Sequence, residues 1–216
     1  MNKIKIAFVV FVLVSVIDII GIIFKFPILV YAFKPLVLLS LLALYTYSVS
    51  NRNKWYILAL VFSFLGDVFL LFEGQLFFMI GLVSFLIAHI LFIKIILSWL
   101  TKSSLFNITV AFIPFLITFS GLIYVLKDSL NELLIPVIIY GITISIFGVV
   151  SLLNYLNTKT TKALWMFFGA LVFIISDSIL AIHKFYFSKE ILGILVMATY
   201  IVAQYLIYRS MILKKV

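Results

Sequence analysis

The chain has 216 residues and a formal net charge of +9; 66% of its residues are hydrophobic and only 11% are charged, and its mean hydropathy is +1.36. Soluble domains carry about 25% charged residues, so no globular core could take up this much apolar surface, and the composition predicts an integral membrane protein. The absence of cysteine excludes disulfides, cysteine-ligated zinc and a cysteine nucleophile.

Polar and charged residues divide the sequence into eight apolar segments, each near the roughly 20 residues that a helix needs to cross the hydrocarbon. The first segment starts with basic residues, as a signal peptide does, but it lacks a small-residue cleavage site and is predicted to be retained. In chain order the predicted spans are residues 5–24, 28–48, 55–72, 76–97, 105–126, 132–153, 162–182 and 190–212. Because the loops between them are short, we expect an all-α polytopic membrane helical bundle that forms one integral membrane domain over residues 1–216.

The basic residues predict the orientation of this bundle, because lysine and arginine in short loops stay on the cytoplasmic side. With eight spans both termini lie on one side, and that side holds eleven basic residues against four on the other. The eleven are Lys3, Lys5, Arg52, Lys54, Lys94, Lys102, Lys159, Lys162, Arg209, Lys214 and Lys215, and the four are Lys25, Lys127, Lys184 and Lys189. Both termini are therefore predicted to be cytoplasmic, and the positive charge is attributed to topology and to anionic headgroups.

Aromatic residues near the predicted span ends are typical of rings that anchor a helix at the headgroup level. They are Trp55, Trp99, Trp165, Tyr47, Tyr56 and Tyr208. On the sixth span, the small residues Gly141, Ser145 and Gly148 predict close packing against another helix.

Four charged residues lie inside spans that are otherwise apolar, namely Asp18, Lys34, Asp67 and Asp177. A charged group in a bilayer is costly unless it is paired or faces water, so each of the four is a candidate functional residue. With a rise of about 1.5 Å per residue, all four lie roughly 8 to 9 Å beneath the predicted outer ends of their helices. We therefore expect one polar pocket inside the bundle that opens toward the outer leaflet.

Three further polar residues are predicted to lie deeper, near the middle of the bilayer. They are His89 on the fourth span, and Tyr200 and Gln204 on the eighth, which lie four residues apart and hence on one helical face. The alternative for any single residue is a structural role, such as a helix-to-helix contact for His89. Three carboxylates and one cation cannot all cancel, however, so the charged cluster as a whole favours a functional site.

The sequence contains a weak internal similarity. Residues 60–67 resemble residues 171–177 apart from one inserted residue, and each segment belongs to an outward-going span. Spans one to four and five to eight could therefore form a 4+4 parallel repeat, an arrangement also found in transporters.

Short strings in five of the spans carry a resemblance to a known family. They are Lys34-Pro35-Leu36, Ser63-Phe64-Leu65-Gly66-Asp67-Val68-Phe69-Leu70, Gly81 with Ser84-Phe85 and Ala88-His89, Ser176-Asp177-Ser178-Ile179-Leu180-Ala181, and Tyr200 with Ala203-Gln204. Together, and in this order, they resemble the YhhN, or lysoplasmalogenase, family over nearly the whole chain. The resemblance implies an eight-span membrane enzyme that hydrolyses the vinyl-ether bond of lysoplasmalogens to a fatty aldehyde and a glycerophospho-base.

This reaction needs two carboxyl groups in different roles. One donates a proton to the β-carbon of the vinyl ether, and the other, as a carboxylate, stabilises the resulting cation and activates water. Burial and a neighbouring carboxylate both favour the protonated form of a carboxyl group, so Asp67 and Asp177 are the expected acid and base. The sequence does not indicate which is which.

The remaining candidates are expected to bind substrate or to tune the acid. Asp18 would adjust the shared proton or bind water, and Lys34 would either pair with the carboxylates, the role we favour, or receive the lipid phosphate. His89, Tyr200 and Gln204 would orient water or the glycerol hydroxyls. No cofactor and no metal are expected, because the sequence has only two histidines, at different predicted depths.

Other functions remain open from the sequence alone. Buried aspartates and a parallel repeat would suit a small transporter or a proton-coupled permease equally well, and a third alternative is a non-catalytic lipid-binding or assembly protein. The expected partners are a lysophospholipid substrate and membrane lipids, without nucleic acid, and the expected location is the bacterial cytoplasmic (inner) membrane. The oligomeric state and the headgroup and chain preference are left open.

Overall fold

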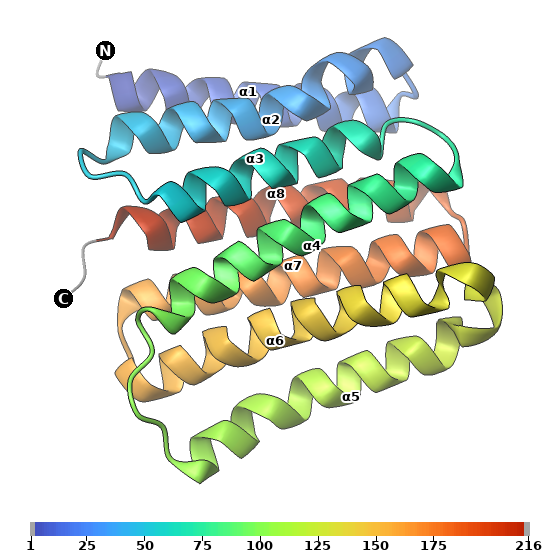
Figure 1. Cartoon of the computed structure of the whole chain (residues 1–216). Helices are drawn as coiled ribbons and strands as arrows, with labels where there is room; N and C mark the ends of the chain where they lie inside the picture. Colours follow the sequence, from blue (N-terminus) through green and yellow to red (C-terminus); the bar gives the residue numbers. More distant parts are fainter. Residues whose placement is uncertain (1–2, 214–216) are drawn as a thin grey trace. The chain divides into compact units, whose positions relative to one another are not determined.

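The computed structural model describes residues 3–213, and every regular element among these residues is a helix (Figure 1). In chain order the elements are α1 (Lys3–Ile23), α2 (Pro27–Ser48), α3 (Lys54–Phe69), α4 (Gln75–Leu97), α5 (Leu105–Leu130), the 3-10 turn η1 (Asn131–Leu133), α6 (Leu134–Thr158), α7 (Thr161–Phe185) and α8 (Glu190–Ile212). The predicted all-α class is confirmed for these residues. Lys214 and Lys215, which the topology prediction uses, lie outside the described residues.

Local sequence explains where several helices begin. Pro27 opens α2, at a position where its missing N–H removes no helical hydrogen bond. Asn53 precedes α3, and its Oδ1 accepts hydrogen bonds from the backbone N–H of Trp55 at 2.9 Å and of Tyr56 at 3.3 Å. Such caps satisfy N–H groups that have no partner in the first helical turn.

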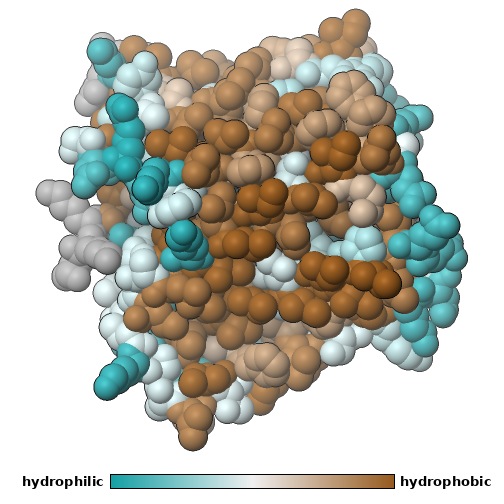
Figure 2. Space-filling model, in the orientation of Figure 1, coloured by the Kyte–Doolittle hydropathy of each residue, from teal (hydrophilic) through white to brown (hydrophobic). Residues whose placement is uncertain are grey.

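Six helical segments of the described chain are long and apolar enough to cross a membrane. One of them, Leu105–Thr158, contains both α5 and α6, whereas α3, with 16 residues, is not among the six. Figure 2 shows apolar side chains over the middle of the helices and hydrophilic residues toward helix ends. These features are those of an integral membrane protein with several spans; the count of eight, the location of the termini and the repeat stay predictions.

The chain divides into two compact units, Met1–Leu91 and Phe92–Val216, with the boundary inside α4. We call them the N-terminal unit and the C-terminal unit. In the N-terminal unit α1 packs along α2, and α2 also contacts α3. In the C-terminal unit α6 contacts both α5 and α7, and α7 pairs closely with α8 (Figure 1). Whether the chain acts as one membrane domain stays a prediction.

The glycines of α6 allow the close packing that the sequence predicts. A Cβ atom at Gly148 would lie 2.5 Å from the ring of Phe115 and 2.7 Å from the Ile174 side chain. A Cβ atom at Gly141 would lie 2.7 Å from the ring of Phe119. Phenylalanine rings of α5 therefore fill the space that side chains on α6 would need, and the packing prediction is confirmed.

Two of the aromatic residues predicted as headgroup anchors are core residues instead. Tyr56 is fully buried and packs edge-on against Tyr45, with ring centroids 4.6 Å apart, and Tyr208 is also buried. The prediction was wrong for these two because distance from a helix end does not indicate which face a ring occupies. The tryptophans are half-buried, and each has a basic side chain over its ring.

Candidate functional site

The three charged candidates of the N-terminal unit lie toward one end of its helices. Asp18 lies in the last two turns of α1, Lys34 in the second turn of α2 and Asp67 two residues before the end of α3. The short connection from α1 to α2 brings the first two to the same end. The Tyr31 hydroxyl donates to the Leu71 carbonyl at 3.2 Å, which ties the residues just after α3 to α2.

Asp18 is fully buried, and among the described residues neither of its carboxylate oxygens has a hydrogen-bond partner. The charge of Lys34 acts on this carboxylate, so the two residues do interact electrostatically. The two side chains do not share a hydrogen bond, so their interaction is the attraction of two charges at a longer distance. This supports a role for Lys34 in offsetting the buried negative charge and leaves its ammonium group available to a second partner.

Lys34 also lines a cavity of about 390 Å³ in the N-terminal unit. Lys25 and Tyr31 line it too, together with apolar residues from the ends of α1 and α3. Two lysines around one cavity, with no acidic side chain among its lining residues, favour an anion such as a lipid phosphate. The alternative role predicted for Lys34 therefore gains support from its surroundings.

Asp67 lies at a tight crossing of α3 and α4. Its side chain is 2% exposed, and one turn earlier Ser63 is fully buried, with no hydrogen-bond partner for its hydroxyl among the described residues. A Cβ atom at the adjacent Gly66 would lie 2.5 Å from the Phe85 ring, and one at Gly81 would lie 3.4 Å from the Gly66 carbonyl oxygen. The glycines let α4 approach α3 closely, and this approach keeps Asp67 away from lipid. His89, farther along α4, is also fully buried.

In the C-terminal unit, Asp177 accepts a hydrogen bond from the hydroxyl group of Tyr140. Asp177 lies on α7 and is half-buried, whereas Tyr140, on α6, is 9% exposed. Tyr140 is a candidate that the sequence analysis missed. It lies six residues after the start of α6, about 9 Å along the helix, close to the depth predicted for Asp177. Applying the depth argument to hydroxyl groups as well as to charges would have found it.

Tyr200 and Gln204 lie beside this pair. The Gln204 Nε2 donates to the Tyr200 hydroxyl at 3.4 Å, as expected for residues one turn apart. Tyr200 packs edge-on against Phe173 at 5.5 Å and interacts electrostatically with Tyr140. The Gln204 Oε1 has no hydrogen-bond partner in the part of the chain described, so this fully buried amide can accept a bond from a water molecule or a ligand hydroxyl.

A side-chain bond sets the register of α7 against α8. The hydroxyl of Ser176, next to Asp177, donates to the Val196 carbonyl at 2.9 Å. A Cβ atom at Gly169 would lie 3.0 Å from the backbone nitrogen of Ile207, so the two backbones are close along their length. Asp177, Tyr200 and Gln204 are thus held on two helices that cannot slide past each other without loss of contacts.

The predicted residues divide between the two units: Asp18, Lys34, Asp67 and His89 lie in the N-terminal unit, and Asp177, Tyr200 and Gln204 lie in the C-terminal unit. A single pocket that contains all of them stays a prediction. No group of three or more histidine, cysteine, aspartate or glutamate residues that could hold a metal ion occurs in residues 3–213. Metal independence of the reaction likewise stays a prediction.

The comparisons with known proteins agree with the resemblance in the sequence. Residues 29–211 match the YhhN family. This region contains all the candidate residues described above except Asp18 and Lys25, which precede it. The chain belongs to the YhhN family. No solved structure matches it.

Curated relatives of this YhhN protein are named lysoplasmalogenases. It is 30% identical over 161 residues to lysoplasmalogenase TMEM86A of Bos taurus, and 30% identical over 163 residues to the protein of that name of Homo sapiens. Each match covers 70% of the chain and 62% of the relative. A lysoplasmalogenase of Mycobacterium bovis is 29% identical over 166 residues, which cover 74% of the chain and 60% of the relative. The chain thus matches less than two thirds of the length of these relatives.

Proposed function

We propose that this protein is a lysoplasmalogenase-like hydrolase of an integral membrane type, which cleaves the vinyl-ether bond of a lysoplasmalogen. The observation that carries the proposal is the similarity to curated lysoplasmalogenases. The YhhN family match over residues 29–211 supports it, because this region contains Asp67 and Asp177. Buried carboxyl groups in apolar helices are costly, and an acid–base reaction gives them a use. The names of the relatives do not favour the alternative of a transporter.

In the first step of the proposed reaction, a carboxylic acid transfers its proton to the β-carbon of the vinyl ether. The C=C π electrons form the new C–H bond, and the ether oxygen shares a lone pair with the α-carbon to give an oxocarbenium ion. We assign the acid to Asp67, because its side chain is only 2% exposed and burial favours a neutral carboxyl group. The carboxylate left behind faces the new cation.

In the second step a water molecule attacks the α-carbon and loses a proton to the second carboxylate, so that a hemiacetal forms. We assign this base to Asp177, because the hydrogen bond from Tyr140 stabilises a carboxylate. The hemiacetal hydroxyl then returns a proton to the Asp67 carboxylate while Asp177 protonates the ether oxygen and the C–O bond breaks. The products are a fatty aldehyde and an alcohol, and both carboxyl groups regain their initial state.

The other candidates have supporting roles in the proposal. Lys25 and Lys34 would bind the phosphate of the lysolipid in the cavity that they line, and the charge of Lys34 would offset that of Asp18. Tyr200 and Gln204 would orient water or glycerol hydroxyls near Asp177. The long alkenyl chain would lie against the apolar helix surfaces. We further propose eight spans with both termini cytoplasmic in a bacterial inner membrane, as the distribution of basic residues predicts.

The test is aldehyde release by the purified protein in detergent with lysoplasmalogen as substrate. We expect aldehyde from the wild-type protein, and none above background from Asp67→Asn or Asp177→Asn, while the thermal unfolding midpoint of each variant stays near that of the wild type. Because the two carboxyl groups act in one reaction, a double variant should lose no more activity than either single variant. Full activity in both variants would refute the two-carboxylate mechanism. Solute or proton flux in liposomes without aldehyde release would favour the transporter.

A further inference from the structure

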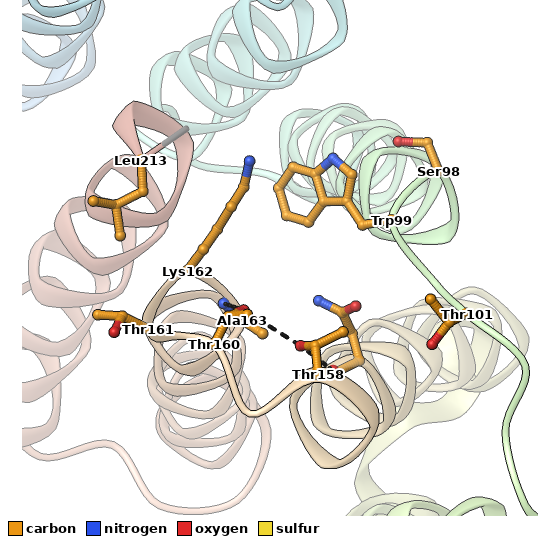
Figure 3. A pocket seen from close by; sticks show the side chains of 10 residues that line it. Ser98, Trp99, Thr101, Thr158, Thr160, Thr161, Lys162, Ala163 and Leu213 are labelled. Carbon is orange, nitrogen blue, oxygen red and sulfur yellow. Dashed lines mark hydrogen bonds between the residues drawn. The ribbon is translucent and has the colours of Figure 1, made fainter. Parts of the chain in front are cut away.

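A second polar cavity lies in the C-terminal unit, where α4, α6 and α8 end and α7 begins. Its volume is about 520 Å³. Its lining is rich in hydroxyl groups, those of Ser98, Thr101, Thr158, Thr160 and Thr161, so we call it the threonine pocket (Figure 3). None of the seven acidic residues of the chain lines it.

The threonine pocket contains the N-terminus of α7, a helix of 25 residues. Thr160 is the N-cap residue, and its Oγ1 accepts a hydrogen bond from the backbone N–H of Ala163 at 3.3 Å. Backbone N–H groups and the helix dipole give this end of a helix a partial positive charge that attracts anions. Lys162, in the first turn, adds a full positive charge to the same lining.

The charge of Lys162 is held in place by its neighbours. Its ammonium group lies over the ring of Trp99, 4.2 Å from the centroid, and Figure 3 shows the two side chains extending toward each other above the pocket. The Ser210 hydroxyl donates to the Lys162 carbonyl at 2.8 Å, which fixes the backbone of this residue against α8. A lysine that is already ordered loses less conformational entropy when it binds a ligand.

A buried amide in the lining is the second and independent indication of a ligand. Asn154 is 3% exposed, lines the threonine pocket and has no hydrogen-bond partner for its Oδ1 within residues 3–213. A buried polar atom without a partner costs free energy, so a partner from outside the described residues is expected. Oδ1 is an acceptor, which calls for a hydroxyl or amine hydrogen on the ligand, next to the anion that Lys162 and the start of α7 attract.

From these contacts we infer that the threonine pocket binds a phosphate group attached to a hydroxyl-bearing carbon chain, such as a glycerol phosphate. The phosphate oxygens accept hydrogen bonds from the first turn of α7, the Thr161 hydroxyl and Lys162. A hydroxyl group of the ligand donates to Asn154. Both a soluble glycerol phosphate and the headgroup of an anionic glycerophospholipid have this chemistry.

This site is separate from the proposed catalytic residues of the same unit. Fifteen residues of α7 separate Lys162 from Asp177, which corresponds to about 22 Å along the helix. The three carbons of one glycerol cannot span that distance, so a lysolipid that reacts beside Asp177 does not place its own phosphate in the threonine pocket. The inference does not depend on the hydrolase activity. With the predicted topology, the pocket opens on the cytoplasmic side.

The test measures binding to the purified full-length chain by titration calorimetry in detergent with sn-glycerol 3-phosphate and inorganic phosphate. In a second arm the protein is placed in nanodiscs of phosphatidylcholine, with or without phosphatidylglycerol, and its thermal unfolding midpoint is measured. We expect Lys162→Gln to weaken glycerol phosphate binding by about tenfold or more, because a charged hydrogen bond is lost. Asn154→Ala should weaken the binding of glycerol phosphate and leave the binding of inorganic phosphate unchanged, since only glycerol phosphate has a carbon-bound hydroxyl group.

Lys159→Gln is the matched control. Lys159 lies three residues before Lys162 and over the ring of Tyr155 at 4.9 Å, but it does not line the threonine pocket. It should change affinity by about twofold or less, because only its screened long-range charge is lost. Thr161→Val, an exposed position, tests the same phosphate contact with little risk to folding.

Binding of glycerol phosphate that depends on Lys162 and Thr161 would support the inference with a soluble source. A rise of the unfolding midpoint that occurs only in the nanodiscs with phosphatidylglycerol, and that depends on Lys162, would support the inference with a lipid headgroup as the ligand. Equal losses in Lys162→Gln and Lys159→Gln would overturn it, and so would the absence of binding in both arms.

Discussion

Replacement of Tyr140 by phenylalanine removes one oxygen atom and with it the hydrogen bond to Asp177. A hydrogen bond to a charged group contributes about 1.5 to 3 kcal/mol, and about 1.4 kcal/mol corresponds to a tenfold change in rate. Because Tyr140 is 9% exposed, little water can replace its hydroxyl, and the upper part of this range applies. We therefore expect kcat for aldehyde release to fall about 40- to 150-fold, since the lost bond stabilises the base that activates water.

The assay couples aldehyde release from lysoplasmalogen to an aldehyde dehydrogenase and follows NADH. KM should change little, because Tyr140 is assigned to the base and not to the substrate headgroup. Tyr155→Phe is the control: Tyr155 also lies on α6, with its ring stacked on Phe167 at a centroid distance of 6.2 Å, about 22 Å along the helix from Tyr140. Unchanged kcat in Tyr140→Phe, beside an inactive Asp177→Asn, would refute the role given to this hydroxyl group.

Three further substitutions test other parts of the structure. Gly66→Ala should lower the free energy of unfolding by about 1 to 3 kcal/mol, because its Cβ would lie 2.5 Å from the Phe85 ring; thermal unfolding in detergent measures this. Gly121→Ala, with nothing within 4 Å of the new atom, should leave the unfolding midpoint unchanged or raise it slightly, and a loss equal to that of Gly66→Ala would contradict the packing argument. Lys34→Gln should raise KM for the lysolipid about tenfold if Lys34 binds phosphate, whereas an unchanged KM would leave it only the pairing role with Asp18.

Much of the fold follows from the sequence because an apolar run of about 20 residues in a bilayer has to satisfy its backbone hydrogen bonds internally. The eight predicted segments correspond to α1 to α8, with ends that differ by a few residues. The largest differences are at α6 and α5, which continue to Thr158 and Leu130, beyond the predicted ends at residues 153 and 126. In the opposite direction, α3 ends at Phe69 although the apolar sequence continues to Phe72. Hydropathy does not show where a helix ends inside an apolar run.

The candidate site was predictable only in part. Charges in apolar spans stand out, so Asp67 and Asp177 were selected as candidates. The four-residue spacing of Tyr200 and Gln204 predicted one helical face, and the structure joins the two side chains by a hydrogen bond. Tyr140 was missed because a tyrosine in an apolar span is unremarkable until its partner is known. Cavities were missed for a similar reason, since the threonine pocket is built from residues that look like ordinary loop and cap residues in the sequence.

With α3 as the predicted third span, its early end has a consequence for the bilayer around the N-terminal unit. Sixteen helical residues are about 24 Å long, several ångströms less than a hydrocarbon layer of about 30 Å. Lipids next to a short helix compress, and headgroups with their hydration follow the helix end inward. Asp67 lies two residues, or about 3 Å, from that end. Thinning of the leaflet would bring interfacial water to this carboxyl group without any channel through the protein. In a thicker membrane, less water would reach the Asp67 carboxyl group.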